Sequence, residues 1–310
     1  MITTAPPRRL SAAALALSLA AACRPASPAP ALAGPVLVGP GVIATAANEY
    51  NPSLSPDGRT LVFARSEPEF RNAKIHVSTW TNGGWSAPEQ VPFSHPRHSD
   101  SDPTLSDDGR ELYFVSNRPY PGRDSTRQDL DLWRVPRVGI GWGTPEPVPG
   151  VNGRAQELGP QRRGEWLYFA STRSGMRGRL DLYRARIVGD STGPVEPLAV
   201  NTANNESDPE VSPDGSLLLF WSDRGNAAGG ADLFVAERQG DGWGQPRPLA
   251  GGASSPAFDF TPSITADGRW LYFASTRADA AGTAPAPADP SAPAHIYRMP
   301  LRAALRPTAP

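Results

Sequence analysis

Five carboxylic acids recur at one position in this chain, three residues before a proline. Arginine recurs at a second position, at the end of the apolar run that follows the proline, in four of the five copies. Carboxylates beside arginines form ion pairs, whereas unpaired carboxylates can hold Ca²⁺ or act on a glycosidic bond. The acids are Glu49, Asp100, Glu157, Glu206 and Asp259. The arginines are Arg118, Arg173, Arg224 and Arg277.

These residues recur because the sequence around them is repeated. Residues 51–58, Asn-Pro-Ser-Leu-Ser-Pro-Asp-Gly, return in related form at 102–109, 208–215 and 261–268. A fifth copy at 164–169 keeps only the second half of the unit. Four steps cover the 210 residues from Pro52 to Pro262, a mean period of about 52. The Asp-Gly pair predicts a tight turn, and the Leu-Tyr-Phe-like run after it predicts a buried strand.

Each unit reads as four short strands, so the sequence predicts an all-β protein with few helices. Five units of this size are typical of a β-propeller with five four-stranded blades. The fifth unit ends after its third strand, near Leu301, while an apolar segment at 36–43 precedes the first unit. We therefore expect this N-terminal strand to complete the fifth blade and close the ring. A stacked open array is the alternative.

The repeat resembles the TolB-type, WD40-like propeller repeats of the bacterial cell envelope. The shared pattern is Ser-Pro-Asp-Gly, a Leu-Tyr-Phe-like run, Ser-x-Arg, Asp-Leu-Tyr and Gly-Trp-x-x-Pro. The resemblance covers residues 36–302 and implies a scaffolding or binding role. TolB itself has six blades and an extra domain, so its partnership does not transfer directly to five units. The second repeat matches most fully, at Ser116-Asn117-Arg118, Asp131-Leu132-Trp133 and Gly141-Trp142.

The N-terminus has the parts of a secretory signal. Arg8 and Arg9 precede an apolar stretch and small residues that end at Cys23, the single cysteine of the chain. This arrangement resembles the lipobox of bacterial lipoproteins; a plain secretory signal with a chance cysteine is the alternative. The predicted organisation is a signal peptide at 1–22, a lipidated tether at 23–35, the propeller at 36–302 and a flexible tail at 303–310. Arg24 after the cysteine resembles the sorting signal for the periplasmic side of the outer membrane.

Charge restricts the classes of partner. The full chain carries a net charge of −1, and removal of residues 1–22, with two arginines and no acid, leaves −1 − 2 = −3. This balance provides no basic footprint for nucleic acid. Membrane attachment is therefore expected through the N-terminal lipid alone. We expect a monomeric propeller whose partner is an envelope protein or a glycan.

Two interpretations of the acids and arginines remain open. Because the start of the first strand and the end of the second lie together in a hairpin, both sets share one face of the ring. They either pair as a structural girdle or form a charged ring for Ca²⁺, a cationic group or sugar hydroxyls, with Asp102 and Asp208 as extra ligands. Glu67 stands where the first unit should have arginine. Glu49, expected to lack a local partner, and Asp100 are therefore the candidate Ca²⁺ ligands; no other cofactor is expected.

Two functions compete on this basis. The first is a non-catalytic envelope lipoprotein that uses its propeller to bind or scaffold a protein or glycan. The alternative is a carbohydrate-active enzyme with channel carboxylates, one of which must be a raised-pKa acid that faces a second carboxylate. Repetition of the acids with the units favours the first. The enzyme would require two of the five acids to lack an arginine and face an open pocket.

Overall fold

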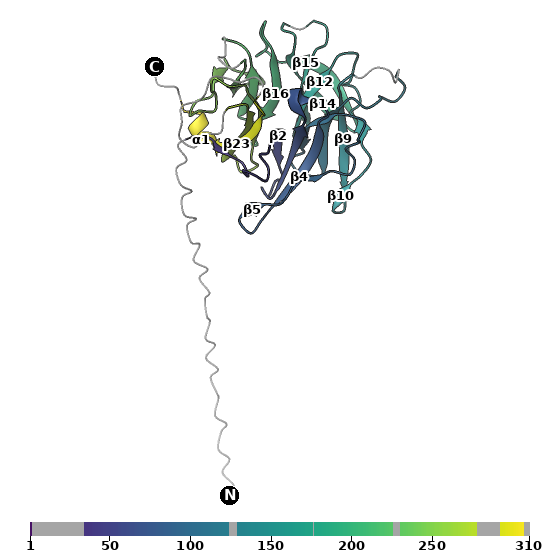
Figure 1. The fold of residues 1–310 in the computed structure, drawn as a ribbon. Coiled ribbons are helices and arrows are strands. Elements are labelled where there is room, and N and C mark those ends of the chain that lie inside the picture. Colours follow the sequence, from purple (N-terminus) through teal and green to yellow (C-terminus); the bar gives the residue numbers. More distant parts are fainter. Residues whose placement is uncertain (2–33, 124–128, 176, 226–229, 278–291, 307–310) are drawn as a thin grey trace. The chain divides into compact units, whose positions relative to one another are not determined.

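Each sequence unit folds into one blade of a five-bladed β-propeller (Figure 1). The computed structural model describes Met1 and residues 34–123, 129–175, 177–225, 230–277 and 292–306. The innermost strands are β2 (Asn48–Leu54), β7 (Asp100–Leu105), β12 (Glu157–Arg163), β16 (Glu206–Val211) and β21 (Asp259–Ile264). The second strands are β3 (Thr60–Ser66), β8 (Glu111–Ser116), β13 (Trp166–Ser171), β17 (Leu217–Ser222) and β22 (Trp270–Ser275). The third strands are β4 (Lys74–Thr81), β9 (Asp131–Val138), β14 (Asp181–Val188), β18 (Asp232–Gln239) and β23 (His295–Pro300).

The outer strand is broken into two short pieces in three blades. Proline follows the Gly-Trp pair there and cannot donate a backbone hydrogen bond to the third strand. The third blade has no Gly-Trp pair and keeps one longer outer strand, β15 (Ser191–Pro197). The broken outer strands are β5 (Gly84–Trp85) with β6 (Glu89–Gln90), β10 (Gly141–Trp142) with β11 (Glu146–Pro147), and β19 (Gly242–Trp243) with β20 (Arg247–Pro248).

The ring closes as the sequence predicts. The fourth strand of the last blade is β1 (Val36–Leu37), which pairs antiparallel with β23, Val36 opposite Arg298 and Leu37 opposite Tyr297. Val38 extends the contact by donating its backbone N–H to the carbonyl oxygen of Ile296 at 2.9 Å. The N-terminal and C-terminal parts of the propeller therefore share one sheet, which leaves no blade incomplete.

The core lies between neighbouring blades. Each second strand contributes a fully buried phenylalanine, because both of its faces are covered by adjacent sheets. One hydrophobic cluster, for example, joins Val62 and Ile75 of the first blade to Phe114 and Trp133 of the second. The five buried rings are Phe63, Phe114, Phe169, Phe220 and Phe273.

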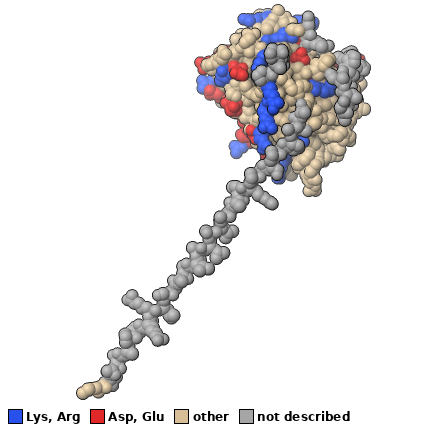
Figure 2. All heavy atoms as spheres, turned by 90° about the vertical axis from the view of Figure 1, so that its left-hand side faces the viewer, with Lys and Arg blue, Asp and Glu red and all other residues tan. Residues whose placement is uncertain are grey.

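The two ends of the blades define two faces of the ring. The Asp-Gly turns between the first and second strands, and the hairpins between the third and fourth, lie on what we call the turn face. Figure 1 shows β5 and β10 extending on the same side of the propeller. The opposite side, where the innermost strands begin, is called the loop face. On the side of the molecule drawn in Figure 2, basic and acidic residues both occur, and several of them lie next to one another.

The C-terminal boundary differs from the predicted one. Residues 301–304 form a short helix, α1 (Leu301–Ala304), in which Leu301 and Ala304 are buried against the fifth blade. The predicted tail at 303–310 therefore begins inside an ordered helix, because Ala304 has an apolar site to fill. A second short helix, the 3₁₀ turn η1 (Pro68–Phe70), follows β3.

The predicted signal peptide and Cys23 lie outside the described residues. Neither helix in the described part of the chain is long and apolar enough to cross a membrane.

Candidate functional site

The five predicted acids lie in the seams between blades, at the loop face. Four of them are the first residue of an innermost strand and Glu49 is the second residue of β2, so they belong to the strands rather than preceding them. The backbone N–H of each acid donates to a carbonyl oxygen just before the third strand of the preceding blade; for Glu206 the acceptor is Leu180, at 2.9 Å. All five acids are 0% exposed.

Every one of these acids has an arginine within ion-pair distance. The nitrogen–oxygen separations are 2.8 Å for Arg118 and Asp100, 3.2 Å for Arg173 and Glu157, 2.9 Å for Arg224 and Glu206, and 2.6 Å for Arg277 and Asp259. Glu157 pairs with Ser171 in the same register in which Asp100 pairs with Ser116, so the damaged third unit keeps its acid in place. We call these five acids and their arginines the seam ion pairs.

Each of these four arginines also donates hydrogen bonds to a backbone carbonyl and a serine, and packs on aromatic rings of the core. Arg224, for example, donates to the carbonyl oxygen of Val200 in the loop that enters its blade, at 2.9 Å, and to Ser222 Oγ at 3.0 Å. Its guanidinium lies 5.1 Å from the ring centres of Phe220 and Phe234, a distance at which cation–π attraction operates. Arg118, Arg173 and Arg277 repeat this arrangement.

The expected vacancy beside Glu49 is absent, so that prediction is wrong. Arg65 supplies the guanidinium from the position that serine occupies in the other blades, with its Nε 3.0 Å from Glu49 Oε1. Arg65 lies in β3 directly opposite Glu49, whereas Glu67 follows the end of that strand. Nδ1 of His295 lies 3.0 Å from the second oxygen of Glu49, and Thr45 donates both its N–H and its hydroxyl to the carboxylate.

Glu49 and Asp100 are held in different seams. Glu49 contacts His295 of the fifth blade, whereas Asp100 accepts hydrogen bonds from Ser94, His95 N–H and Ser116 at the junction of the first and second blades. Among the described residues, no group of three or more His, Cys, Asp or Glu is arranged to hold a metal ion. The geometry gives the Ca²⁺ prediction at this pair no support, and the prediction stays open to titration.

Burial opposes ionisation in two of the seams. Desolvation raises the pKa of Glu157 to about 7, with Arg173 opposing the shift and Asp131 adding to it. Desolvation and the neighbouring Asp259 raise the pKa of Asp232 to about 6. The pKa of Asp259 is also raised by burial, although Arg277 lowers it. These shifts follow from carboxylates enclosed between sheets.

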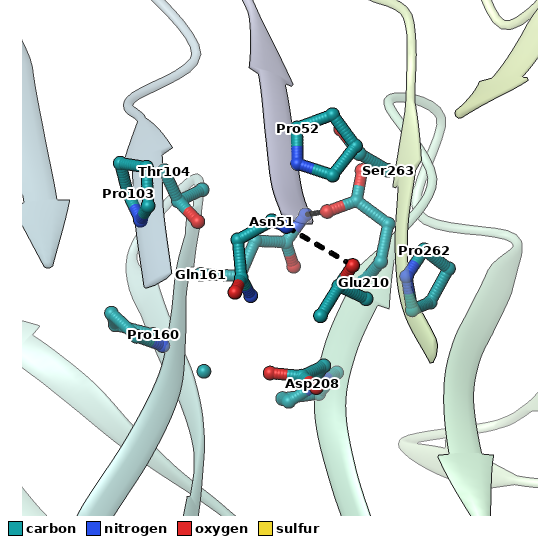
Figure 3. Close-up of a pocket in the computed structure, with 13 residues that line it drawn as sticks. Asn51, Pro52, Pro103, Thr104, Pro160, Gln161, Asp208, Glu210, Pro262 and Ser263 are labelled. Carbon is teal, nitrogen blue, oxygen red and sulfur yellow. Dashed lines mark hydrogen bonds between the residues drawn. The ribbon is translucent and has the colours of Figure 1, made fainter. Parts of the chain in front are cut away.

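A different set of residues lines the central channel. Every innermost strand has a β-bulge at its proline, and the residue before that proline has a left-handed backbone with φ between 48° and 53°. A bulge changes the direction of the side chains beside it. These bulges and the prolines after them converge on the axis from all five blades (Figure 3). The residues are Asn51, Asp102, Gly159, Asp208 and Thr261.

Two of these channel residues form a pair of carboxylic acids. Asp102 Oδ2 accepts the backbone N–H of Gly159 at 3.0 Å, and Asp208 Oδ2 accepts the indole N–H of Trp221 at 2.6 Å. Both carboxyls contact Gly159, where an added Cβ would lie 2.5 Å from Asp208 Oδ1. Desolvation and the charge of Asp102 raise the pKa of Asp208 to about 8; burial also raises that of Asp102. Asp208 therefore holds a proton near neutral pH.

The channel has little free space beside Asp208, the member of this pair that lines its cavity. Its cavity volume is about 20 Å³, enough for about one water molecule. Pockets that hold small-molecule ligands measure about 300–1,000 Å³. A sugar ring does not fit in this cavity beside Asp208, so the channel geometry suits a water or a proton rather than a glycosidic bond.

Sequence reasoning missed three features of this region. The bulges are invisible in a periodicity argument, although the Asn-Pro, Asp-Pro and Thr-Pro pairs at repeated positions mark them. Arg65 was missed because it stands two residues before the repeated arginine. Asp102 and Asp208, predicted only as extra ligands, are the channel carboxylates, while the five acids of the predicted ring lie in the seams.

Several solved structures resemble this propeller in fold. A thermostable family-43 glycoside hydrolase superimposes with a TM-score of 0.55 at 10% identity, covering 85% of this chain and 92% of that one. An α-L-arabinofuranosidase from Lactobacillus brevis gives 0.54 at 14% identity, with 85% and 92% covered. A putative TolB from Agrobacterium tumefaciens gives 0.48 at 18% identity, with 83% and 91% covered.

The similarities to the glycoside hydrolase and the arabinofuranosidase support the shared fold and leave the activity undetermined, since their identities of 10% and 14% are far below 25%. No protein-family model matches the chain. No curated protein matches it either.

Proposed function

We propose that this protein is a non-catalytic binding or scaffolding module of the bacterial cell envelope, anchored by a lipid on Cys23. The observation that carries the proposal is the pairing of all five seam acids with arginine at 0% exposure. Carboxylates held in this way stabilise the contacts between blades and are not available to a substrate. The repeat resemblance to TolB-type envelope proteins and the predicted lipobox support the location.

The turn face offers the surface for a partner. Large apolar side chains stand exposed at its hairpins: Trp80 at 38%, Val138 at 62%, Ile140 at 100% and Val188 at 60%. All belong to the ends of third strands or the turns after them, so they gather on one side of the ring. They come from three neighbouring blades, and we propose that a partner contacts them together on this face.

A glycoside hydrolase is the second candidate, favoured by one observation. Asp102 and Asp208 form a carboxyl pair in which Asp208, with a pKa of about 8, is protonated near neutral pH. A glycosidase needs such an acid opposite a second carboxylate. The cavity of about 20 Å³ that Asp208 lines opposes the assignment, because it cannot admit the sugar.

A turnover assay separates the two functions. The wild-type protein and Asp208→Asn would be incubated with aryl arabinofuranosides, aryl xylosides and arabinan, and released phenol or reducing sugar would be measured. The proposal predicts no release above buffer from either protein. Release by the wild type that Asp208→Asn abolishes would establish the hydrolase and overturn the binding role.

A further inference from the structure

A groove on the turn face, between the fifth and first blades, is rich in tryptophan. Its cavity volume is about 390 Å³, within the range of ligand pockets. The Asp-Gly turns of the two blades form its sides. Trp80 and Trp85 come from the first blade, and Trp270, Tyr272 and Arg298 from the fifth. The groove is far larger than the channel cavity.

The tryptophan pair in this groove departs from the pattern of the other blades. In the second and fourth blades the Gly-Trp tryptophan lies opposite an arginine, whose guanidinium stacks on the indole at 5.0 Å for Arg137 and 4.1 Å for Arg238. In the first blade the opposite residue is Trp80, which packs edge-to-face on Trp85 with ring centres 5.2 Å apart. Trp80 is 38% exposed. The fold therefore does not require tryptophan there, since arginine serves the same position twice.

Polar groups of both charges surround the aromatic rings. One oxygen of Asp57 accepts hydrogen bonds from the hydroxyl of Ser55 and the backbone N–H of Arg59. In the same way, one oxygen of Asp267 accepts hydrogen bonds from the hydroxyl of Thr265 and the backbone N–H of Arg269. These bonds use one oxygen of each carboxylate and fix both carboxylates at the groove, and the second oxygen of Asp267 lies 4.0 Å from Arg269 Nε. The hydrogen bond from Ser55 lowers the pKa of Asp57, so this carboxylate stays ionised at neutral pH.

Arg298 provides the donor on the opposite side. Its guanidinium lies 5.1 Å from the ring centre of Trp270, and its Nη1 is 3.5 Å from the hydroxyl of Tyr272. A cation already occupies this indole face, which disfavours a cationic ligand at the same ring. Carboxylate acceptors and a guanidinium donor beside the exposed indole of Trp80 suit a ligand with an apolar face and an edge of hydroxyl groups.

We propose that this groove, lined by Trp80, Trp85, Trp270, Asp57, Asp267 and Arg298, binds a neutral oligosaccharide. The C–H face of a sugar ring packs against Trp80 or Trp85, while its hydroxyls donate to the two carboxylates and accept from Arg298. The inference rests on the proposed binding function and gives it a ligand class and a location.

Calorimetric titration of the full-length protein tests the inference. The probes are cellotriose, maltotriose, arabinotriose and triacetylchitotriose. We expect saturable binding of at least one, weakened about tenfold or more by Trp80→Arg. This substitution installs the residue found in the second and fourth blades, so the melting temperature should be unchanged.

A matched pair of turn variants supplies the control. Asp57→Asn and Asp214→Asn disturb the same turn, in which the aspartate accepts a serine hydroxyl and a backbone N–H, but the turn of Asp214 is not in the groove. Only Asp57→Asn should weaken binding. Binding of no probe, or equal binding by wild type and Trp80→Arg, overturns the inference. Cleavage of a bound probe would instead overturn the non-catalytic function and leave the groove in place.

Discussion

Replacing Arg224 with alanine removes the charged partner of a fully buried carboxylate. Glu206 is 0% exposed, the Arg224 side chain is 14% exposed, and their nearest atoms are 2.9 Å apart. The same substitution deletes the bonds to Ser222 and Val200 and the cation–π contacts with two phenylalanine rings. The loss therefore combines an uncompensated charge with lost packing.

The magnitude follows from these contacts. Removing one partner of a buried ion pair costs about 3–5 kcal/mol. Glu206 keeps hydrogen bonds from the N–H and hydroxyl of Thr202 and from Ser222, and water can reach the space that Arg224 leaves. We therefore expect the free energy of unfolding to fall by about 2–3 kcal/mol. For a domain of this size the melting temperature should fall by about 4–12 °C.

Thermal unfolding followed by circular dichroism measures the effect, with Arg186→Ala as the control. Arg186 and Glu165 form an ion pair of similar length, 2.7 Å, but are 59% and 57% exposed. Exposed pairs contribute about 0–1 kcal/mol, so this control should melt close to the wild type. Adding Glu206→Gln to Arg224→Ala should restore part of the stability. Equal melting temperatures for the two arginine variants would refute the reasoning, as would a more stable Glu206→Ala, which a ring of repelling ligand carboxylates predicts.

Three further predictions concern closure, pH and anchoring. Deleting residues 35–45 removes β1 and exposes the edge of β23, so most of the stability should be lost; an unchanged melting temperature would show that the strand is dispensable. Asp208, with a pKa of about 8 in the folded protein and 3.8 as its ordinary value, holds a proton that the unfolded chain releases. The free energy of unfolding should therefore fall as pH rises through that window, and Asp208→Asn should flatten this dependence and stabilise the protein at high pH by about 2–4 kcal/mol, measured by urea unfolding. A pH dependence equal to that of the wild type would count against the channel pair. Cys23→Ser should move the protein from the membrane to the soluble fraction, and identical fractionation of both proteins would exclude the lipid anchor.

The repeat made the architecture predictable because one unit recurs five times with its core residues in place, and four of the copies keep the Asp-Gly turn. The same periodicity located the acids and four arginines, and the incomplete last unit indicated the closing strand. The direction of the acid side chains could not be predicted, because a bulge at each proline shifts the register within the innermost strand. Pairing of Glu49 with Arg65 could not be predicted either, because in the other four blades serine stands opposite the acid and the arginine follows two residues later.

The aromatic groove illustrates the remaining limit of sequence reasoning. Trp80 and Trp270 are about 190 positions apart in the sequence, and only closure of the ring makes the blades that carry them neighbours. A comparison of the Gly-Trp hairpins would have shown that Trp80 replaces an arginine. The inferred role of Trp80 in ligand binding depends on Arg298 and the two Asp-Gly turns, which line the same groove.

Titration calorimetry with Ca²⁺ tests most directly whether the seam ion pairs are structural. Wild type and Glu49→Ala would be compared, with Glu165→Ala as a control at an exposed pair. We expect no heat beyond dilution in any of them, because Arg65, His295 and Thr45 already contact the carboxylate oxygens of Glu49. A saturable heat that Glu49→Ala abolishes and Glu165→Ala retains would contradict it and establish the ring as a ligand site.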